Sequence, residues 1–469
     1  MVALPSALEL EERFSLFELL VDGQPIWYNC RERYGRLASG ASYQRARLRT
    51  VRQVATLALR SARSLLQLRH LARPYTALAI SNTLKIAVDD HGRPYQPHVA
   101  VLRDALGADA VLQFELPSLT EADRLSATRD DRVLHLDAVC LAAAAWAAWL
   151  RRAPWGPRRR VEAFLARQSF AKSHPAYATV AALMISEAAN QIAFGTLIGT
   201  LGRLTSATFD VDIAGASRFL FHHTSRPTLE IQHGVIHENH PAYMFPRSAR
   251  PTMRRRFARH WIVTQAPHYT SLLQEAGVLP PSQVFTVGPL TLARDTQNSA
   301  AESAGWPSRG GHGLRVLMTS QPGQYATARI SEFASMLAAD QRFNVVIRPH
   351  PLERGLPAPY RGLPGVTCSE DGLPTARLLQ LCDVHISFNS TCLEEAYLLG
   401  KPSVVLDDNH PLWRSYVQSG RLMALTDFTP QSLLAAIHTN QIRLVAPLDY
   451  QSQLDSLRTV LNALTTQPH

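Results

Sequence analysis

Residues 383–406, DVHISFNSTCLEEAYLLGKPSVVL, carry the pattern of one strand, one helix and a second strand. A strand is expected over 383–386, followed by a polar turn, a helical segment over about 391–399 and an apolar run over 403–406. A glycine and a proline separate the helix from the apolar run, as is typical of helix ends. This order predicts a parallel sheet with helices packed on its faces.

The same alternation extends on both sides of this unit. C-terminal to residue 313 we expect further strands at 315–318, 344–347 and 366–368, with helices near 327–338, 374–381, 430–437 and 450–464. N-terminal to it we expect strands at 75–80, 110–114, 228–231, 260–264 and 284–287, separated by helical stretches such as 138–150 and 174–202. Both halves of the chain therefore predict doubly wound sheets.

Residues 288–313 are rich in glycine, serine, alanine and proline and show little periodicity, which predicts an interdomain linker. We therefore expect an α/β protein with two Rossmann-like domains facing across a cleft. The first is an N-terminal α/β domain with helical insertions over 1–289, and the second a nucleotide-binding domain over 290–469 whose last helix crosses back.

Length and composition agree with two large domains. The 469 residues are 46% hydrophobic and 18% charged, which excludes large-scale disorder. The five cysteines form no C-x-x-C pair, so neither a disulfide framework nor a zinc site is indicated. The N-terminal residues lack the basic and apolar regions of a signal peptide, and we expect a cytoplasmic protein.

The net charge is +10, and the basic residues are clustered, notably in 45–73 and at Arg254, Arg255 and Arg256. Such clusters are solvated helix faces or sites for an anionic partner. Among partners we favour the inner face of the cytoplasmic membrane, and no nucleic acid is expected, because no helix-turn-helix, RNP or zinc-finger pattern occurs. The apolar run 138–150 is too short to span a bilayer, and it is either a buried helix or a helix lying on the membrane surface.

Two loops at expected strand ends are suited to a phosphate. In the first, Arg348 and His350 can donate hydrogen bonds to an anion, and flanking prolines, Pro351 among them, restrict the backbone. In the second, Asn389 precedes Ser390 and Thr391, either of which can cap a helix whose N-terminus would attract the same phosphate. The carboxylates of Glu394 and Glu395 follow in the first turn, where one can bind a ribose diol.

A third loop follows the expected strand 228–231 and continues QHGVIHENHPAY over 232–243. His233 is the candidate general base or phosphate partner, with Glu238 in reserve. The spacing of its histidines also suits a metal, but the glycine and proline argue for an irregular loop, so no metal site is assigned. The remaining residues expected to line the acceptor side or the cleft are Gln232, Gly234, His237, His240, Tyr243 and Ser320.

These motifs together resemble the GT-B glycosyltransferases that build bacterial capsules and O-antigens. The HP loop and the Ser-Thr turn are similar to those of CMP-sugar transferases for sialic acid and Kdo. The loop beginning at Gln232 is similar to the W-H-G loop of CDP-glycerol glycerophosphotransferases, with glutamine in place of tryptophan. No acid in the first domain matches the acidic motif of the sialyltransferases, so inversion and retention both stay open.

The resemblance implies a metal-independent enzyme without a cofactor. It would transfer a sugar from a nucleotide-activated donor, CMP-linked by preference or UDP-linked, to a capsule, O-antigen or lipid-linked glycan. A glycerophosphotransferase that uses CDP-glycerol is the first alternative. The second is a non-catalytic protein of the same fold that binds through its basic surface.

Overall fold

The computed structural model describes residues 4–38, 67–68, 71, 73–82, 87–88, 94–116, 132–213, 225–232, 234–299, 305–307, 313–321, 324–350, 353, 360–369, 373–388, 390–406, 411–425, 427–439 and 448–466. The chain divides into two compact units. Unit 1 comprises Met1–His233, Glu238–Gly288 and Leu454–His469, and unit 2 comprises Gly234–His237 and Pro289–Gln453. Most of the basic segment 45–73 lies outside the described residues.

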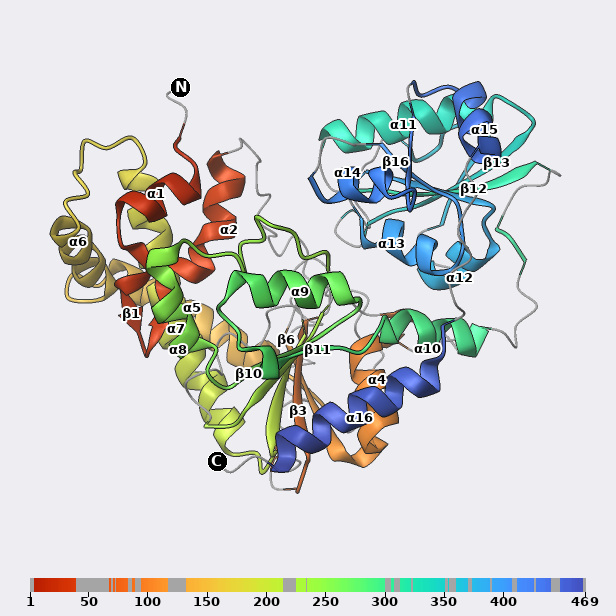
Figure 1. Ribbon diagram of the computed structural model, residues 1–469. Coiled ribbons are helices and arrows are strands. Elements are labelled where there is room, and N and C mark those ends of the chain that lie inside the picture. The colour runs from red at the N-terminus through yellow and green to blue at the C-terminus, as the bar shows by residue number, and fades with distance from the viewer. Residues whose placement is uncertain are drawn as a thin grey trace. The chain divides into compact units, whose positions relative to one another are not determined.

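Unit 1 is built on a seven-stranded sheet whose strands are all parallel (Figure 1). The strands, in spatial order, are β11 (Val284–Thr286), β10 (His260–Thr264), β9 (Thr228–Ile231), β8 (Phe209–Asp212), β3 (Ala77–Asn82), β6 (Val111–Leu116) and β7 (Val133–His135). Nearly every residue of these strands is buried, as expected for a parallel sheet covered on both faces. Two short antiparallel pairs accompany it, β1 (Leu20–Val21) with β2 (Gln24–Pro25) and β4 (Ala87–Val88) with β5 (Pro94–Tyr95).

The main helices of unit 1 are α1 (Ala7–Arg13), α2 (Ile26–Ala38), α4 (Pro97–Leu106), α5 (Asp137–Arg152), α6 (Pro157–Arg167), α7 (Tyr177–Arg203), α8 (Arg250–Arg256), α9 (Pro267–Ala276) and α16 (Tyr450–Thr466). Among the described residues, only α7 is long and apolar enough to cross a membrane, and 61% of its apolar window is buried inside the protein. Its alanines pack against Ala143, Ala147 and Leu150 of α5. The burial marks α7 as a core helix of this unit.

Unit 2 is built on a six-stranded parallel sheet. Its spatial order is β14 (Val366–Cys368), β13 (Phe343–Arg348), β12 (Leu314–Thr319), β15 (Val384–Ser387), β16 (Ser403–Val405) and β17 (Met423–Ala424). The helices are α10 (Leu290–Ser299), α11 (Gln324–Ala338), α12 (Thr375–Leu381), α13 (Thr391–Leu398), α14 (Pro411–Gln418) and α15 (Pro430–Thr439).

Alternate residues of the central strands of unit 2 enter two separate cores. Val316 and Met318 of β12 pack with residues of α11 and α15, whereas Leu317 packs with residues of α12 and α13. The period of two in a strand sends neighbouring side chains to opposite faces, so helices cover both faces of the sheet (Figure 1). The predicted α/β class with two Rossmann-like parallel sheets is confirmed by these two topologies.

Several elements differ from the sequence-based expectation, among them β7 (Val133–His135), β17 (Met423–Ala424) and α14 (Pro411–Gln418), and the reasons are clearest for α10 and β8. Residues 290–299 of the expected linker form α10, because Leu290, Leu292 and Ala293 are buried. Strand β8 was not expected, because Asp210 and Asp212 interrupt its apolar residues. The Asp210 carboxylate is buried against the guanidinium of Arg226, 2.7 Å away, which makes a charged residue tolerable in a central strand.

Candidate functional site

The sheet of unit 2 has a topological switch point between β12 and β15. From β12 the chain moves outward to β13 and β14, and it then returns to β15 and continues in the other direction. Ligands of open α/β sheets bind outside the carboxyl ends of strands at such a point. Because Thr319 pairs with both Arg348 and Ser387, the three strands β12, β13 and β15 end at the same level. The predicted phosphate loops therefore follow neighbouring strand ends.

The loop after β13 is held by hydrogen bonds from both sides. The guanidinium of Arg348 donates to the Ser369 carbonyl at 2.7 Å, beyond the end of β14. The backbone N–H of His350 donates to Ser320 Oγ at 2.8 Å, so the serine that follows β12 fixes the loop. Both Arg348 and His350 are partly exposed, and Pro351 lies outside the described residues. Ser320, expected to line the cleft, is buried and ties the loop to β12.

A carboxylate that the sequence did not single out lies at the centre of this loop. Glu353 is only 7% exposed, and its carboxylate accepts hydrogen bonds from the hydroxyls of Ser320, Thr327 and Tyr360. One of its oxygens lies 3.3 Å from the backbone N–H of His350, and its own N–H donates to the His350 carbonyl at 2.8 Å. Glu353 thus joins the end of β12, helix α11 and the backbone of His350.

Helix α13 begins at the second predicted loop. Ser390 is its N-cap, with extended backbone, and its Oγ accepts from the Cys392 N–H at 3.3 Å. The prediction that Ser390 or Thr391 caps a helix is confirmed, and Thr391 is the first helical residue. The Leu393 N–H donates to the Ser390 carbonyl at 3.0 Å, and the N-terminus of such a helix is suited to an anion. Asn389 lies outside the described residues.

The two carboxylates of α13 have different surroundings. Glu394 is 3% exposed, and one of its oxygens accepts a hydrogen bond from the Tyr416 hydroxyl of α14 at 2.9 Å. Glu395 is partly exposed and lies close to Cys392. Burial, with the charge of Glu395, raises the pKa of the Cys392 thiol above its usual range. Of the two, Glu395 is the more accessible to a ligand.

A fully buried histidine lies within the sheet below these loops. His385 of β15 is hydrogen-bonded through Nε2 to Thr319 Oγ1 and through Nδ1 to Ser403 Oγ, both at 2.9 Å. Burial lowers the pKa of His385 to about 3, so the ring is neutral at physiological pH. The side chain links β12, β15 and β16 next to the switch point, and it stabilises the scaffold without facing solvent.

In the loop after β9, the predicted residues fall into different environments. Gln232 is 2% exposed, and its Oε1 accepts from the Gln265 N–H at 2.9 Å, which joins the ends of β9 and β10. His233 lies outside the described residues, and Gly234 and His237 belong to unit 2. Glu238 is exposed.

Further along this loop, Tyr243 is buried instead of lining a surface. Its hydroxyl donates to the Glu230 carboxylate, which also lies 2.9 Å from His260 Nε2. Burial, together with the charge of Glu230, raises the pKa of Tyr243 well above its usual value. His240 is partly exposed and stacks on the Tyr243 ring with centroids 4.9 Å apart. This network anchors the loop and leaves His240 on its outer side.

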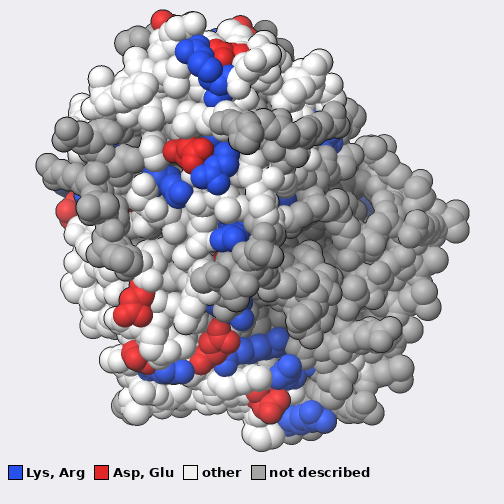
Figure 2. Space-filling model, turned by 90° about the vertical axis from the view of Figure 1, so that its right-hand side faces the viewer, with Lys and Arg blue, Asp and Glu red and all other residues white. Residues whose placement is uncertain are grey.

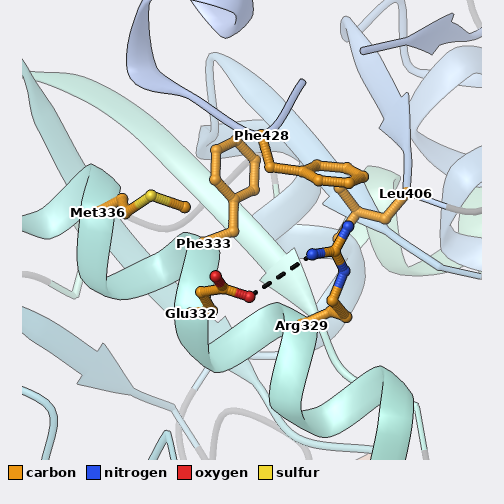
Figure 3. Close-up of a pocket in the computed structure, with 6 residues that line it drawn as sticks. All are labelled: Arg329, Glu332, Phe333, Met336, Leu406 and Phe428. Carbon is orange, nitrogen blue, oxygen red and sulfur yellow. Dashed lines mark ion pairs between the residues drawn. The ribbon is translucent and has the colours of Figure 1, made fainter. Parts of the chain in front are cut away.

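Among the described residues, His, Cys, Asp and Glu side chains form no group of three or more that could hold a metal ion. A hollow of about 260 Å³ lies in unit 2 next to α11 (Figure 3). It is lined by Arg329, Glu332, Phe333, Met336, Leu406 and Phe428. The Arg329 guanidinium covers the Phe428 ring at 4.4 Å and pairs with Glu332 at 3.6 Å. None of the predicted site residues lines this hollow.

The fold and the strand ends together define an α/β protein with two Rossmann-like sheets and an edge suited to an anionic ligand. No known protein family matches the sequence, and no curated protein does. Solved structures with a similar chain trace include the UDP-GlcNAc 2-epimerase from Neisseria meningitidis bound to UDP-GlcNAc, with 14% identity and a TM-score of 0.45 over 82% of this chain and 99% of that one.

Two further similar structures are, by their names, a glycotransferase and a polymerase. The glycotransferase of kitacinnamycin has 15% identity and a TM-score of 0.44, over 84% of this chain and 96% of that one. The wall teichoic acid polymerase TagF, in a variant form soaked with CDPG, has 9% identity and a TM-score of 0.47, over 89% and 96% of the two chains. Such distant likenesses carry no information about activity, which has to be argued from the site itself.

Proposed function

We propose that this protein is a glycosyltransferase that takes its sugar from a nucleotide-activated donor. The donor is a CMP-sugar such as CMP-Kdo or CMP-sialic acid by preference, with UDP-sugars as the other candidates. The acceptor is a capsule, O-antigen or lipid-linked glycan. The enzyme needs no cofactor or metal ion, and it works in the cytoplasm, at the inner face of the membrane.

One observation carries this proposal: the loop after β13 and the N-terminus of α13 both follow strands that pair with β12, next to the switch point of unit 2. There the partly exposed Arg348 and His350 supply cationic or hydrogen-bonding side chains. The first turn of α13 supplies backbone N–H groups and the positive end of a helix dipole. These are the donors that a nucleotide phosphate requires.

In the proposed reaction, the bond between the sugar and the nucleotide phosphate breaks and negative charge develops on the phosphate. Preorganised donors stabilise such charge most where it forms, which is the role we assign to Arg348, His350 and the Ser390–Thr391 turn. Glu395 is the candidate for the ribose hydroxyls. His233, or Glu238 in its place, would take the proton from the acceptor hydroxyl.

Thermal unfolding in the presence of CMP, CDP, UDP, GDP, ADP and CDP-glycerol tests the donor assignment. A ligand that binds only the folded protein raises the unfolding temperature, by an amount set by its concentration relative to its Kd. We expect a cytidine or uridine nucleotide to do so. His350→Ala should weaken this binding by about tenfold to a hundredfold, since a hydrogen bond to a charged group contributes roughly 1.5–3 kcal/mol.

His438→Ala is the matched control, because His438 is an exposed histidine of α15 in the same unit. It should bind nucleotide like the wild type. Equal binding by the His350 variant, or the absence of a shift with every nucleotide, would contradict the phosphate assignment. Phosphorus in the transfer product would assign the chain to the glycerophosphotransferases instead.

A further inference from the structure

Helix α5 of unit 1 exposes an apolar face. Its buried side, with Ala143, Ala147 and Leu150, packs on α7. The opposite side carries no uncharged polar side chain, and its exposed residues are Leu141, Ala142, Ala144, Ala145, Trp149 and Arg152. Surface helices of soluble proteins normally turn charged and polar residues to solvent. This face is therefore unusual for a helix that only contacts water.

Two tryptophans extend this face beyond the end of the helix. Trp149 is 54% exposed and Trp155 is 65% exposed, and their rings meet edge to face with centroids 5.3 Å apart. The turn that follows α5 is tight, because a Cβ on Gly156, the residue after Trp155, would come within 2.9 Å of the Leu150 carbonyl oxygen. The glycine thus allows the close turn that keeps both indoles together at the surface.

The charge around the tryptophan pair is predominantly basic. Residues 138–162 contain five arginines and one acidic residue, Glu162, which lies 3.8 Å from the Arg158 guanidinium. Arg152 ends α5, and Arg158, Arg159 and Arg160 are exposed in the first turn of α6. By contrast, basic and acidic side chains are interspersed on the described part of the face drawn in Figure 2. A surface with a net positive charge, next to an apolar face, favours a partner that is both anionic and apolar.

We propose that the α5–α6 surface, formed by Leu141, Trp149, Trp155, Arg152 and Arg158–Arg160, docks this protein onto a bilayer that contains anionic lipids. Tryptophan is enriched at the level of lipid headgroups, because its ring is apolar and its indole N–H is polar. The alanine and leucine face of α5 lies flat against the acyl boundary, and the arginines contact the anionic headgroups. The inference goes beyond the transfer reaction and needs no nucleotide.

Co-sedimentation with lipid vesicles tests this surface directly. Wild-type protein should pellet with vesicles of phosphatidylcholine that contain phosphatidylglycerol, and it should stay in solution with phosphatidylcholine alone. Trp149→Ala combined with Trp155→Ala should reduce the partition coefficient by about tenfold or more. Arg152→Gln combined with Arg159→Gln should reduce it by about fivefold for each charge removed, and added salt should have a similar effect.

Two matched controls distinguish the effect of this surface from the effect of losing charge or an exposed apolar side chain elsewhere. Arg203→Gln with Arg247→Gln removes the same charge from exposed positions elsewhere in unit 1, and Leu204→Ala removes an exposed leucine at the end of α7. Both variants should bind vesicles nearly as the wild type does. Unchanged circular dichroism and thermal unfolding show that each variant is folded.

Three outcomes would overturn the proposal. The first is a wild-type protein that does not bind anionic vesicles. The second is a double tryptophan variant whose vesicle binding equals that of the wild type. The third is a dimer, seen by sedimentation velocity without lipid and lost in the tryptophan variant, in a protein that does not bind vesicles. That result would assign the surface to a second copy of the chain.

Discussion

At the scale of single residues, Glu353 is the group on which the order of the phosphate loop depends. Replacing it with alanine leaves the hydroxyls of Ser320, Thr327 and Tyr360 without their shared acceptor in a buried place. We expect Glu353→Ala to lower the free energy of unfolding by about 2–3 kcal/mol. We also expect it to weaken nucleotide binding, because the His350 backbone loses its support. Urea unfolding and calorimetric titration measure the two effects.

Glu353→Gln separates the two effects, because glutamine keeps one acceptor oxygen and a similar volume. This variant should recover most of the stability and part of the nucleotide affinity. Glu332→Ala, at an exposed position of α11, is the control and should change neither quantity appreciably. An alanine variant at position 353 with wild-type stability would show that the carboxylate does not organise the loop.

His385 makes the stability of the folded protein depend on pH, and the burial of its ring determines the direction of the change. The folded chain keeps this ring neutral down to a pKa of about 3, whereas the unfolded chain takes up a proton near pH 6.5. The stability contributed by the neutral ring is therefore complete above pH 6.5 and is lost as the pH falls toward 3. At about pH 5 the loss amounts to about 2 kcal/mol.

His385→Gln cannot titrate in this range, so its stability should fall less than that of the wild type between about pH 7 and about pH 5. Urea unfolding at the two pH values checks the difference in slope. Parallel curves for the two proteins would mean that the histidine is protonated in the folded state as well.

Sequence reasoning found the residues whose role depends on near neighbours and missed those whose partners are distant. The Ser390 cap could be predicted because a serine directly before a helix commonly caps it, whatever the rest of the fold. Glu353 has its partners at residues 320, 327 and 360, and only the fold brings these together. Tyr243 was expected at a surface, yet it is buried, because its acceptor Glu230 lies on β9.

At the scale of elements, the N-cap of α13 is assigned two roles that can be separated. Ser390→Ala removes a cap and should cost about 1 kcal/mol of stability. Thr429→Ala removes the comparable cap of α15, where Thr429 Oγ1 accepts from the Ser432 N–H at 3.2 Å, and should cost a similar amount. Only the Ser390 variant should also lose nucleotide affinity in titrations. An equal loss of nucleotide affinity in both variants would show that the Ser390 cap stabilises α13 but does not contact the nucleotide.

Elements were predictable where short runs rich in β-branched or aromatic residues are bounded by polar or glycine-containing turns. Strands β9, β10 and β14 have the bounds that their sequence indicates. Strand β8 was missed because buried acids hide its pattern, and helix α10 was missed because few of its residues are apolar and the segment after it is rich in glycine and serine. Such cases depend on partners that the local sequence does not contain.

At the scale of the whole molecule, unit 1 is formed by segments that lie before and after the main part of unit 2 in the sequence. The chain leaves unit 1 for unit 2 at Pro289, and from Leu454 on it belongs to unit 1 again. Within α16, the Arg458 guanidinium donates to the carbonyls of Asp104 and Ala105 at the end of α4. The C-terminal helix therefore completes the first unit, although it follows the second in sequence.

Removing a buried side chain from α16 should therefore destabilise unit 1, although unit 2 lies between the two in sequence. Leu457 is fully buried, and Leu457→Ala should lower the stability of unit 1 by about 2–5 kcal/mol. Hydrogen exchange should speed up in α4 and α16, while β12, β13 and β15 of unit 2 keep their protection. Asn462→Ala, on the exposed side of the same helix, is the control and should leave exchange unchanged. Faster exchange confined to unit 2 would show that α16 stabilises the unit that directly precedes it in sequence.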